Sequence, residues 1–169
     1  MRNEEGSSSN TREDNEFDVF TQNRNGPSPR QSRIAPPCQP RYMERSAVNE
    51  DEAEIMFDRT LKFGDVTWRY KSLYIEWREM VMGALKQEEK RRFAREGFLE
   101  VPTVDPDGNS YKMWLLPSLL KRTAMTLNKE WHDLVRANHL KAGDRVQGWA
   151  IRGDDGQLRC AMKLMYKLY

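Results

Sequence analysis

The stretch that decides the fold class is residues 98–115, FLEVPTVDPDGNSYKMWL. Apolar and polar residues alternate on both sides of Asp105–Gly108, which is typical of two half-buried strands. Within Asp105–Gly108 a proline presets φ at one corner and a glycine accepts a positive φ at the next, so a tight turn is predicted. The stretch therefore predicts an antiparallel hairpin, and Pro102 favours an edge position for its first strand.

Two helices are predicted on either side of this hairpin. Residues 77–95 place apolar side chains at helical spacing, and Gly97 ends this amphipathic segment. A shorter helix is predicted over residues 129–137, with Asn128 as its N-cap and Asn138 in the left-handed position at its C-terminus.

The remaining predicted strands are short apolar or β-branched runs: residues 55–61, 73–75, 125–127, 145–151 and 158–166. A turn at Gly153–Gly156 joins the last two into a terminal hairpin. About seven short strands and two helices predict a mainly β domain of the α+β type, and favour an open barrel with protruding loops. Trp114, Trp131 and Trp149 are expected in its core.

The first 53 residues differ in composition from the rest of the chain. Hydrophobic residues make up about 23% of residues 1–53 and about 45% of residues 54–169. So few apolar side chains cannot offset the entropy of ordering a chain. We therefore expect a disordered, low-complexity tail over residues 1–53 and one compact domain over residues 54–169.

Charge also differs between residues 1–53 and residues 54–169. Residues 1–53 carry 7 basic and 10 acidic side chains, leaving 21 of the 28 basic and 16 of the 26 acidic residues in 54–169. The expected domain is therefore mildly basic, which permits a nucleic-acid partner without requiring one.

Several classes of protein are not expected. The chain has neither the roughly 18–20 apolar residues of a membrane span nor the apolar run of a signal peptide, so a place inside the cell is expected, with no membrane partner. Cys38, Cys160, His132 and His139 lack metal-ligand spacing, so we expect no metal and no disulfide framework. Carboxylate–lysine clusters, phosphate-cradling glycine loops and a Ser/His/Asp set are not found, so we expect no enzyme, cofactor or small-molecule substrate.

A resemblance to a known family rests on segments whose order and spacing are specific in combination. The segments are Thr60–Val66, Glu88–Lys90, Val104–Gly108, Trp131–Asp144 and Trp149. Together they resemble the plant-specific B3 DNA-binding domain, in particular its subgroup of small, poorly characterised proteins, over roughly residues 54–166. The resemblance implies a seven-stranded open pseudobarrel flanked by two helices, acting in the nucleus as a transcription regulator that binds double-stranded DNA and other transcription proteins.

The family inserts two loops, called arms, into the major groove of DNA. Carried onto this chain, arm 1 is residues 62–72 and arm 2 is residues 117–124. Independently of the family, both regions are basic: four basic residues and one acid lie between Arg59 and Lys71, and three basic residues and no acid between Lys112 and Arg122. The residues expected to contact DNA are Lys62, Thr67, Trp68, Arg69, Tyr70, Lys71 and Ser72 in arm 1, Ser118, Lys121, Arg122 and Thr123 in arm 2, and Lys129 beyond it.

Some of these residues have a structural alternative. Trp68 could contact DNA or anchor arm 1 to the barrel, and Asp65 is expected to cap the arm. Lys129 and His132 are expected in the first turn of a helix, where they either approach a phosphate or form solvated surface. The acidic Glu130 close to the expected phosphate path favours a rival interpretation.

In that rival, the chain is a degenerate B3-fold domain with little or no DNA binding. It would serve as a protein-interaction module, for example through the charged segment Lys86–Arg95. Glu76, which replaces a proline usual in the family, is a further departure at this edge of the barrel.

Overall fold

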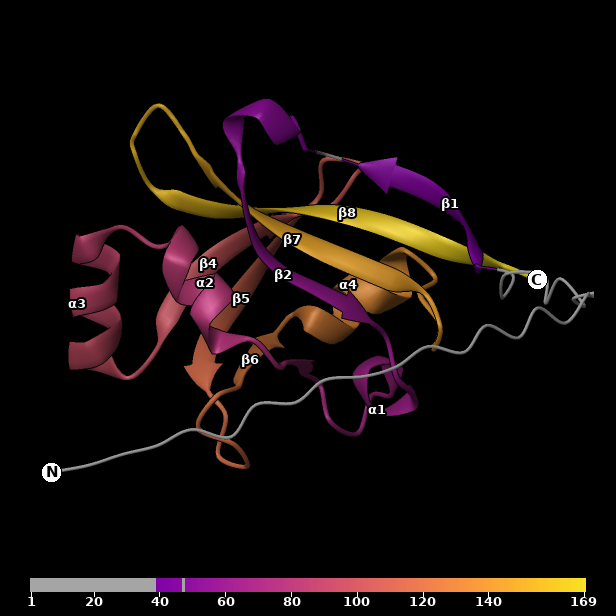
Figure 1. The fold of residues 1–169 in the computed structure, drawn as a ribbon, viewed down its shortest axis with the longest axis horizontal. Coiled ribbons are helices and arrows are strands. Elements are labelled where there is room, and N and C mark those ends of the chain that lie inside the picture. Colours follow the sequence, from indigo (N-terminus) through magenta and orange to yellow (C-terminus); the bar gives the residue numbers. More distant parts are fainter. Residues whose placement is uncertain (1–38, 47) are drawn as a thin grey trace, which may run out of the picture. The chain divides into compact units, whose positions relative to one another are not determined.

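The computed structural model describes residues 39–46 and 48–169. The described chain forms one eight-stranded sheet, in which seven strands are neighbours in the order β2-β7-β8-β4-β5-β6-β3 and the eighth, β1, pairs with β8 beside this path (Figure 1). Their bounds are β2 Glu54–Thr60, β7 Arg145–Arg152, β8 Leu158–Leu168, β4 Leu99–Val104, β5 Ser110–Pro117, β6 Met125–Lys129 and β3 Leu73–Ile75. All pairings along this path are antiparallel except the short parallel pairing of β4 with β8.

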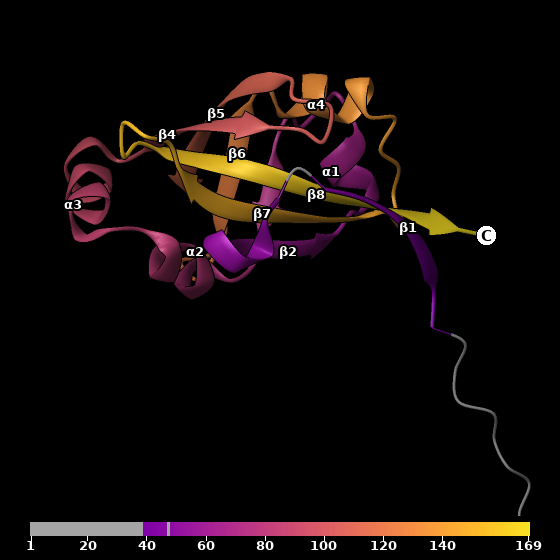
Figure 2. The same cartoon turned by 90° about the horizontal axis from the view of Figure 1, so that it is seen from above.

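The sheet curls until its two end strands, β2 and β3, contact one another without a hydrogen-bonded ladder. This is the seven-stranded open pseudobarrel expected from the sequence. Alternation along the strands sends one set of side chains inward, among them Leu73, Met113 and Leu115, each 0% exposed. Figure 2 shows helix α2 (Arg78–Ala84) and helix α4 (Trp131–Ala137) on opposite sides of the sheet.

The prediction of one helix over residues 77–95 is wrong. Two helices, α2 and α3 (Gln87–Glu96), are separated by extended backbone at Leu85 and Lys86. The carboxylate of Glu89 accepts a hydrogen bond from the backbone N–H of Lys86 at 2.8 Å, which caps the new helix. Gly97 ends α3 in the left-handed conformation, as predicted.

Strand β4 is not an edge strand, because it lies between β5 and β8. The ladder with β8 pairs only Thr103 with Cys160 and Val104 with Ala161. Pro102 precedes these pairs, so its missing N–H removes no bond from that ladder. A proline is therefore compatible with this central strand.

Ordered structure begins before Glu54. Strand β1 (Arg41–Ser46) pairs antiparallel with the second half of β8, and a 3-10 turn at Glu50–Glu52 leads into β2. Residues 41–46 were expected to belong to a disordered tail. Their polar sequence still forms a strand because its backbone completes the β8 ladder and its charges pair across it, as between Glu44 and Lys163 at 2.9 Å. The same expectation for residues 1–38 lies outside the described residues.

Helix α4 starts later than predicted. Asn128 lies in β6 and is not the N-cap, and Lys129 ends that strand with a left-handed φ of 71°. The helix begins at Trp131 after Glu130. At its other end, Asn138 has φ −100° and the left-handed residue is His139, φ 53°.

Trp131 is 1% exposed, as expected for a core residue. The same expectation is wrong for Trp114 and Trp149, which are only half-buried. Each lies between buried strand neighbours, Met113 and Leu115 in one case and Gly148 and Ala150 in the other, so alternation turns both indoles outward.

In the described part of the chain, no helix is both long and apolar enough to cross a membrane. Nor do three or more His, Cys, Asp or Glu side chains gather there in a metal-binding arrangement.

Candidate nucleic-acid interface

Arm 1 is a folded connection and not a free loop. It opens with the single-turn helix α1 (Phe63–Val66). The buried carboxylate of Asp65 accepts hydrogen bonds from the backbone N–H of Lys62 at 2.8 Å and from the guanidinium of Arg59 at 2.9 and 3.1 Å. The same carboxylate accepts a longer bond, 3.4 Å, from the N–H of Tyr74 in β3. The structure thus agrees with the capping role expected for Asp65.

Helix α4 holds arm 1 from the other side. The indole Nε1 of Trp131 donates to the backbone carbonyl of Asp65 at 2.7 Å, a bond between residues 66 apart in the sequence. Because Trp131 is itself buried in the core, arm 1 is attached to the barrel at a fixed point.

Arm 2 is a short closed loop between β5 and β6. The N–H of Ser118 donates to the carbonyl of Ala124 at 3.0 Å, and the N–H of Ala124 donates to the carbonyl of Lys121 at 3.0 Å. The carbonyl of Thr123 accepts from the N–H of Arg78, which ties the arm to α2. Arm 2 therefore has a defined shape as well as a defined position.

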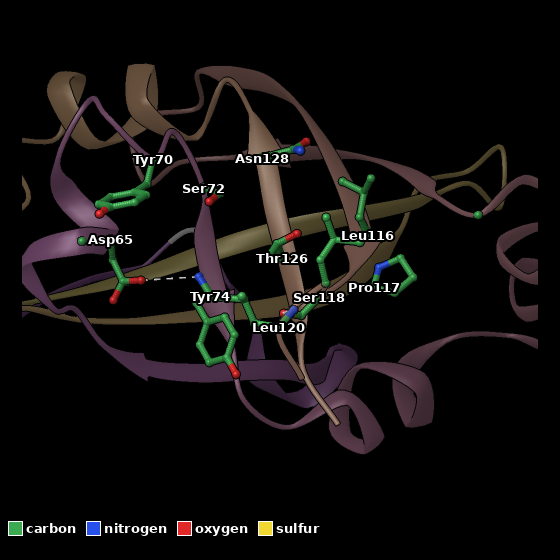
Figure 3. Close-up of a pocket in the computed structure, with 13 residues that line it drawn as sticks. Asp65, Tyr70, Ser72, Tyr74, Leu116, Pro117, Ser118, Leu120, Thr126 and Asn128 are labelled. Atoms are coloured by element: carbon green, nitrogen blue, oxygen red, sulfur yellow. Dashed lines mark hydrogen bonds between the residues drawn. The ribbon is translucent and has the colours of Figure 1, made fainter. Parts of the chain in front are cut away.

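The two arms lie along the same side of the molecule, the lower side in Figure 1. Between them is a hollow of about 800 Å³, lined by Tyr70 and Ser72 from arm 1 and by residues 117–120 of arm 2. Thr126 and Asn128 of β6 also line it (Figure 3). A second hollow beside it is lined by Lys71 and Lys129 together with Tyr70, Ser72 and Trp114.

The predicted contact residues fall into three groups around this side of the barrel. Tyr70, Lys71, Ser72, Ser118 and Lys129 line the hollow between the arms or the second hollow beside it. The next set, Thr67, Trp68, Arg69 and again Tyr70, lines a depression next to His132 of α4. The last set, Lys121, Arg122 and Thr123, faces α2 across a hollow that also contains Trp77.

Unlike the other predicted contact residues, Lys62 lines none of these hollows. Its ammonium lies 3.9 Å from the carboxylate of Glu76, which also binds Arg59 at 3.0 Å. Glu76 therefore offsets part of the positive charge at the start of arm 1. In residues 39–46 and 48–169, by contrast, no ion pair involves Arg69, Lys71, Lys121 or Arg122.

Two of the lysines have an unusual backbone. Lys71 and Lys129 have left-handed φ values of 47° and 71°, which non-glycine residues adopt at a cost. The ammonium of Lys129 lies 3.6 Å from the ring centroid of Trp114, close enough for a cation–π contact. Lys129 therefore lies at the end of β6, with its ammonium over the ring of Trp114, and not in the first turn of α4.

The structure also bears on the roles considered for Trp68 and Glu130. Trp68 is 70% exposed, so the alternative that it anchors arm 1 to the barrel is wrong. The carboxylate of Glu130 accepts a hydrogen bond from the N–H of Lys112 at 2.7 Å. Through this bond the side chain of Glu130 connects the start of α4 to β5.

The apolar surface of the arms was not predicted from the sequence. Phe63 is 77% exposed in arm 1, while Leu119 and Leu120 in arm 2 are 103% and 92% exposed. Residues 117–124 were considered only for their charged and hydroxyl side chains. A pair of adjacent leucines between Pro117–Ser118 and two cations is an available signal for them, because a loop that only connects strands has no need of two consecutive large apolar residues.

An open barrel of seven strands, with two cationic loops on one side, defines the class of this chain as a B3-type pseudobarrel. Residues 38–166 match the family described as B3 domain-containing protein At2g31720-like, and the chain belongs to that family. The resemblance recognised in the sequence is confirmed, and the match starts well before Glu54. The B3 domain family is a DNA-binding family.

The solved Arabidopsis FUS3–DNA complex is similar to this chain at 16% identity and a TM-score of 0.44, covering 69% of this chain and 98% of that one. A comparison with curated proteins found no match.

Proposed function

We propose that this protein is a sequence-preferring binder of double-stranded DNA that regulates transcription in the nucleus. Its two arms enter the major groove from one side, and other transcription proteins are its further partners. Positive side chains first attract the duplex and release its counterions, and the arms then reach base edges.

The observation that carries this proposal is the placement of two anchored arms around one hollow. Residues 62–72 and 117–124 come from distant parts of the chain, yet Tyr70 and Ser72 line the same space as Ser118. The arms contribute four cations without an ion-pair partner in the described chain: Arg69, Lys71, Lys121 and Arg122. Cations without an ion-pair partner, on two loops that share one side of the molecule, suit a polyanion.

The test is a titration of the full chain with duplex DNA at several salt concentrations. If about four to six phosphates are engaged, log affinity should fall with log salt at a slope of about −4 to −5. A slope near zero, or no binding to random duplex at low salt, would rule out the proposal.

Point substitutions in the arms separate base reading from phosphate contact. Arg69→Ala or Arg122→Ala should cost about 1–3 kcal/mol on the preferred site if the side chain reads guanine. Equal losses on all duplexes would assign that side chain to a phosphate. Arg159→Ala is the matched control, because Arg159 is exposed at the start of β8, and the turn between β7 and β8 lies away from the arms, at the upper left of Figure 1.

The rival interaction module is supported by the exposed apolar residues of the arms and by Glu76. It predicts that no duplex is bound at low salt, whereas binding of a protein partner is abolished when these apolar residues are replaced. The same titration therefore decides between the two functions.

A further inference from the structure

The tip of arm 2 presents two leucine side chains directly to solvent. Leu119 is 103% exposed and Leu120 is 92% exposed. Among large apolar residues of the described chain, only the terminal Tyr169, at 99%, is comparably exposed. Both leucines thus leave nearly their whole apolar surface in water, which is unfavourable unless something covers it.

Hydrogen bonds hold the leucines in this position. The loop is closed between Ser118 and Ala124 at 3.0 Å, and the N–H of Leu120 donates to the hydroxyl of Ser118 at 3.2 Å. The tip is therefore a formed turn, and its shape directs the two side chains outward.

The surroundings of the leucines indicate what covers them. Lys121 and Arg122 follow immediately and have no ion-pair partner within the described chain. Protein and DNA interfaces both bury far more surface than two side chains supply, so area does not identify the partner. An apolar tip with adjacent cations matches a surface that offers isolated apolar groups beside a line of negative charge.

The major groove of DNA is such a surface. Phosphates border it, and its one apolar group is the C5-methyl group of thymine. We propose that Leu119 and Leu120 contact thymine methyl groups, so that the protein prefers duplexes with thymine beneath arm 2. This inference rests on the proposed function and adds to it the base that arm 2 selects.

The experiment compares duplexes that differ only in those methyl groups. A duplex selected from a random pool by the full chain is prepared a second time with deoxyuridine in place of each thymidine of the bound site. Wild-type protein should bind the uracil duplex about fourfold more weakly for each methyl group that the leucines cover in the thymine duplex. The Leu119→Ala/Leu120→Ala double variant should bind the thymine duplex more weakly by a similar factor and should not distinguish the two duplexes.

Matched controls separate this effect from general damage. Leu168→Ala, which removes a half-exposed leucine at the end of β8, should keep both the affinity and the preference for thymine. Because Leu119 and Leu120 are exposed, the double variant should unfold at the wild-type denaturant concentration.

Several results would overturn the inference alone. These are a selected site without thymine, equal binding of both duplexes by the wild type, or an undiminished thymine preference in the double variant. A double variant that changes the mass of the protein in solution but not its DNA binding would assign the leucines to self-association. If no duplex is bound at any salt concentration, the proposed function fails, and this inference fails with it.

Discussion

At the scale of single residues, Asp105 is the centre of a buried hydrogen-bond network. It is 0% exposed, and its carboxylate accepts bonds of 2.9 to 3.1 Å from the backbone of Asp107 and Asn109 and from the side chains of Asn109, Tyr111 and Asn138. Asn138 thereby ties the end of α4 to the hairpin turn.

This network should make stability depend on acid. Burial acts to raise the pKa of Asp105, but hydrogen bonds from Asn138, Asn109 and Tyr111 outweigh it and hold that pKa below its ordinary value. A carboxyl with a lowered folded-state pKa stabilises the fold above its unfolded pKa of about 3.9, and that stabilisation is lost as pH falls through the folded-state pKa. Urea unfolding at pH 7 and pH 3 should show this loss.

The variant Asp105→Ala tests the assignment. It should lose about 2–4 kcal/mol at pH 7, because buried donors are left without an acceptor, and should show a smaller change between pH 7 and pH 3. Asp154→Ala, at an exposed turn, is the control. An acid dependence that is unchanged in Asp105→Ala would place its origin elsewhere.

The thiol of Cys160 should be unreactive in the native protein. It is 1% exposed, and burial raises the pKa of its thiol to about 12. Since the thiolate is the reactive form, a thiol reagent at pH 8 should modify Cys160 only when the barrel opens. The measurement is labelling of a Cys38→Ser variant with and without urea. Rapid labelling in native buffer would contradict the structure.

At the scale of elements, the break between α2 and α3 depends on an ion pair. The carboxylate of Glu89 lies 2.7 Å from the guanidinium of Arg152 in β7, and both side chains are largely buried. Removing one partner leaves the other charge buried and unpaired, so Glu89→Ala should cost about 3 kcal/mol in urea unfolding. Glu88→Ala, its exposed neighbour, should cost less than about 0.5 kcal/mol. Equal effects would show that the pair does not stabilise this corner.

The pairing of β2 with β7 requires a glycine. A bulge between Ile55 and Phe57 turns both Met56 and Phe57 inward, and Phe57 is the direct partner of Gly148. A Cβ at Gly148 would overlap the ring of Phe57 and press on the sulfur of Cys160.

Replacing that glycine should therefore destabilise the barrel. Gly148→Ala should lose about 1–3 kcal/mol, or more if the ring cannot move. Gly83→Ala is the matched control in α2, where a Cβ would meet nothing within 4 Å, and it should be neutral or slightly stabilising. Thermal unfolding of both variants checks the difference, and a neutral Gly148→Ala would contradict the close approach.

At the scale of the whole molecule, β1 should belong to the folding unit. Its six residues pair with β8 from Arg41↔Leu168 to Ser46↔Lys163, and Glu44 binds Lys163. A chain that begins at residue 48 should therefore be less stable than one that begins at residue 39, by about 2 kcal/mol, the sum expected for several cross-strand pairs. Urea unfolding of the two chains gives this value, and equal midpoints would show that β1 adds nothing.

The order and type of most elements follow from local sequence. The turn at Asp105–Gly108, the alternation on either side of it and the terminal hairpin depend on neighbouring residues, and all three were predicted. The same holds for the two basic connections that became the arms. Contact of those arms with DNA remains a prediction.

Features that depend on distant residues could not be predicted in this way. Helical spacing over residues 77–95 gives no sign that Arg152 draws Glu89 into a new helix cap. The polar segment 41–46 forms a strand only because β8 offers it a free edge, and Pro102 is tolerated in a central strand only because the ladder with β8 starts after it.

The class of the fold, most of its strands and the charge of its arms thus follow from the sequence alone, because periodicity and turn chemistry act over a few residues. The attachment of the arms to the barrel, and the projection of Leu119 and Leu120 from one of them, are known only from the folded structure. Those facts depend on contacts such as Trp131 with Asp65, between segments that only the closing of the barrel brings together.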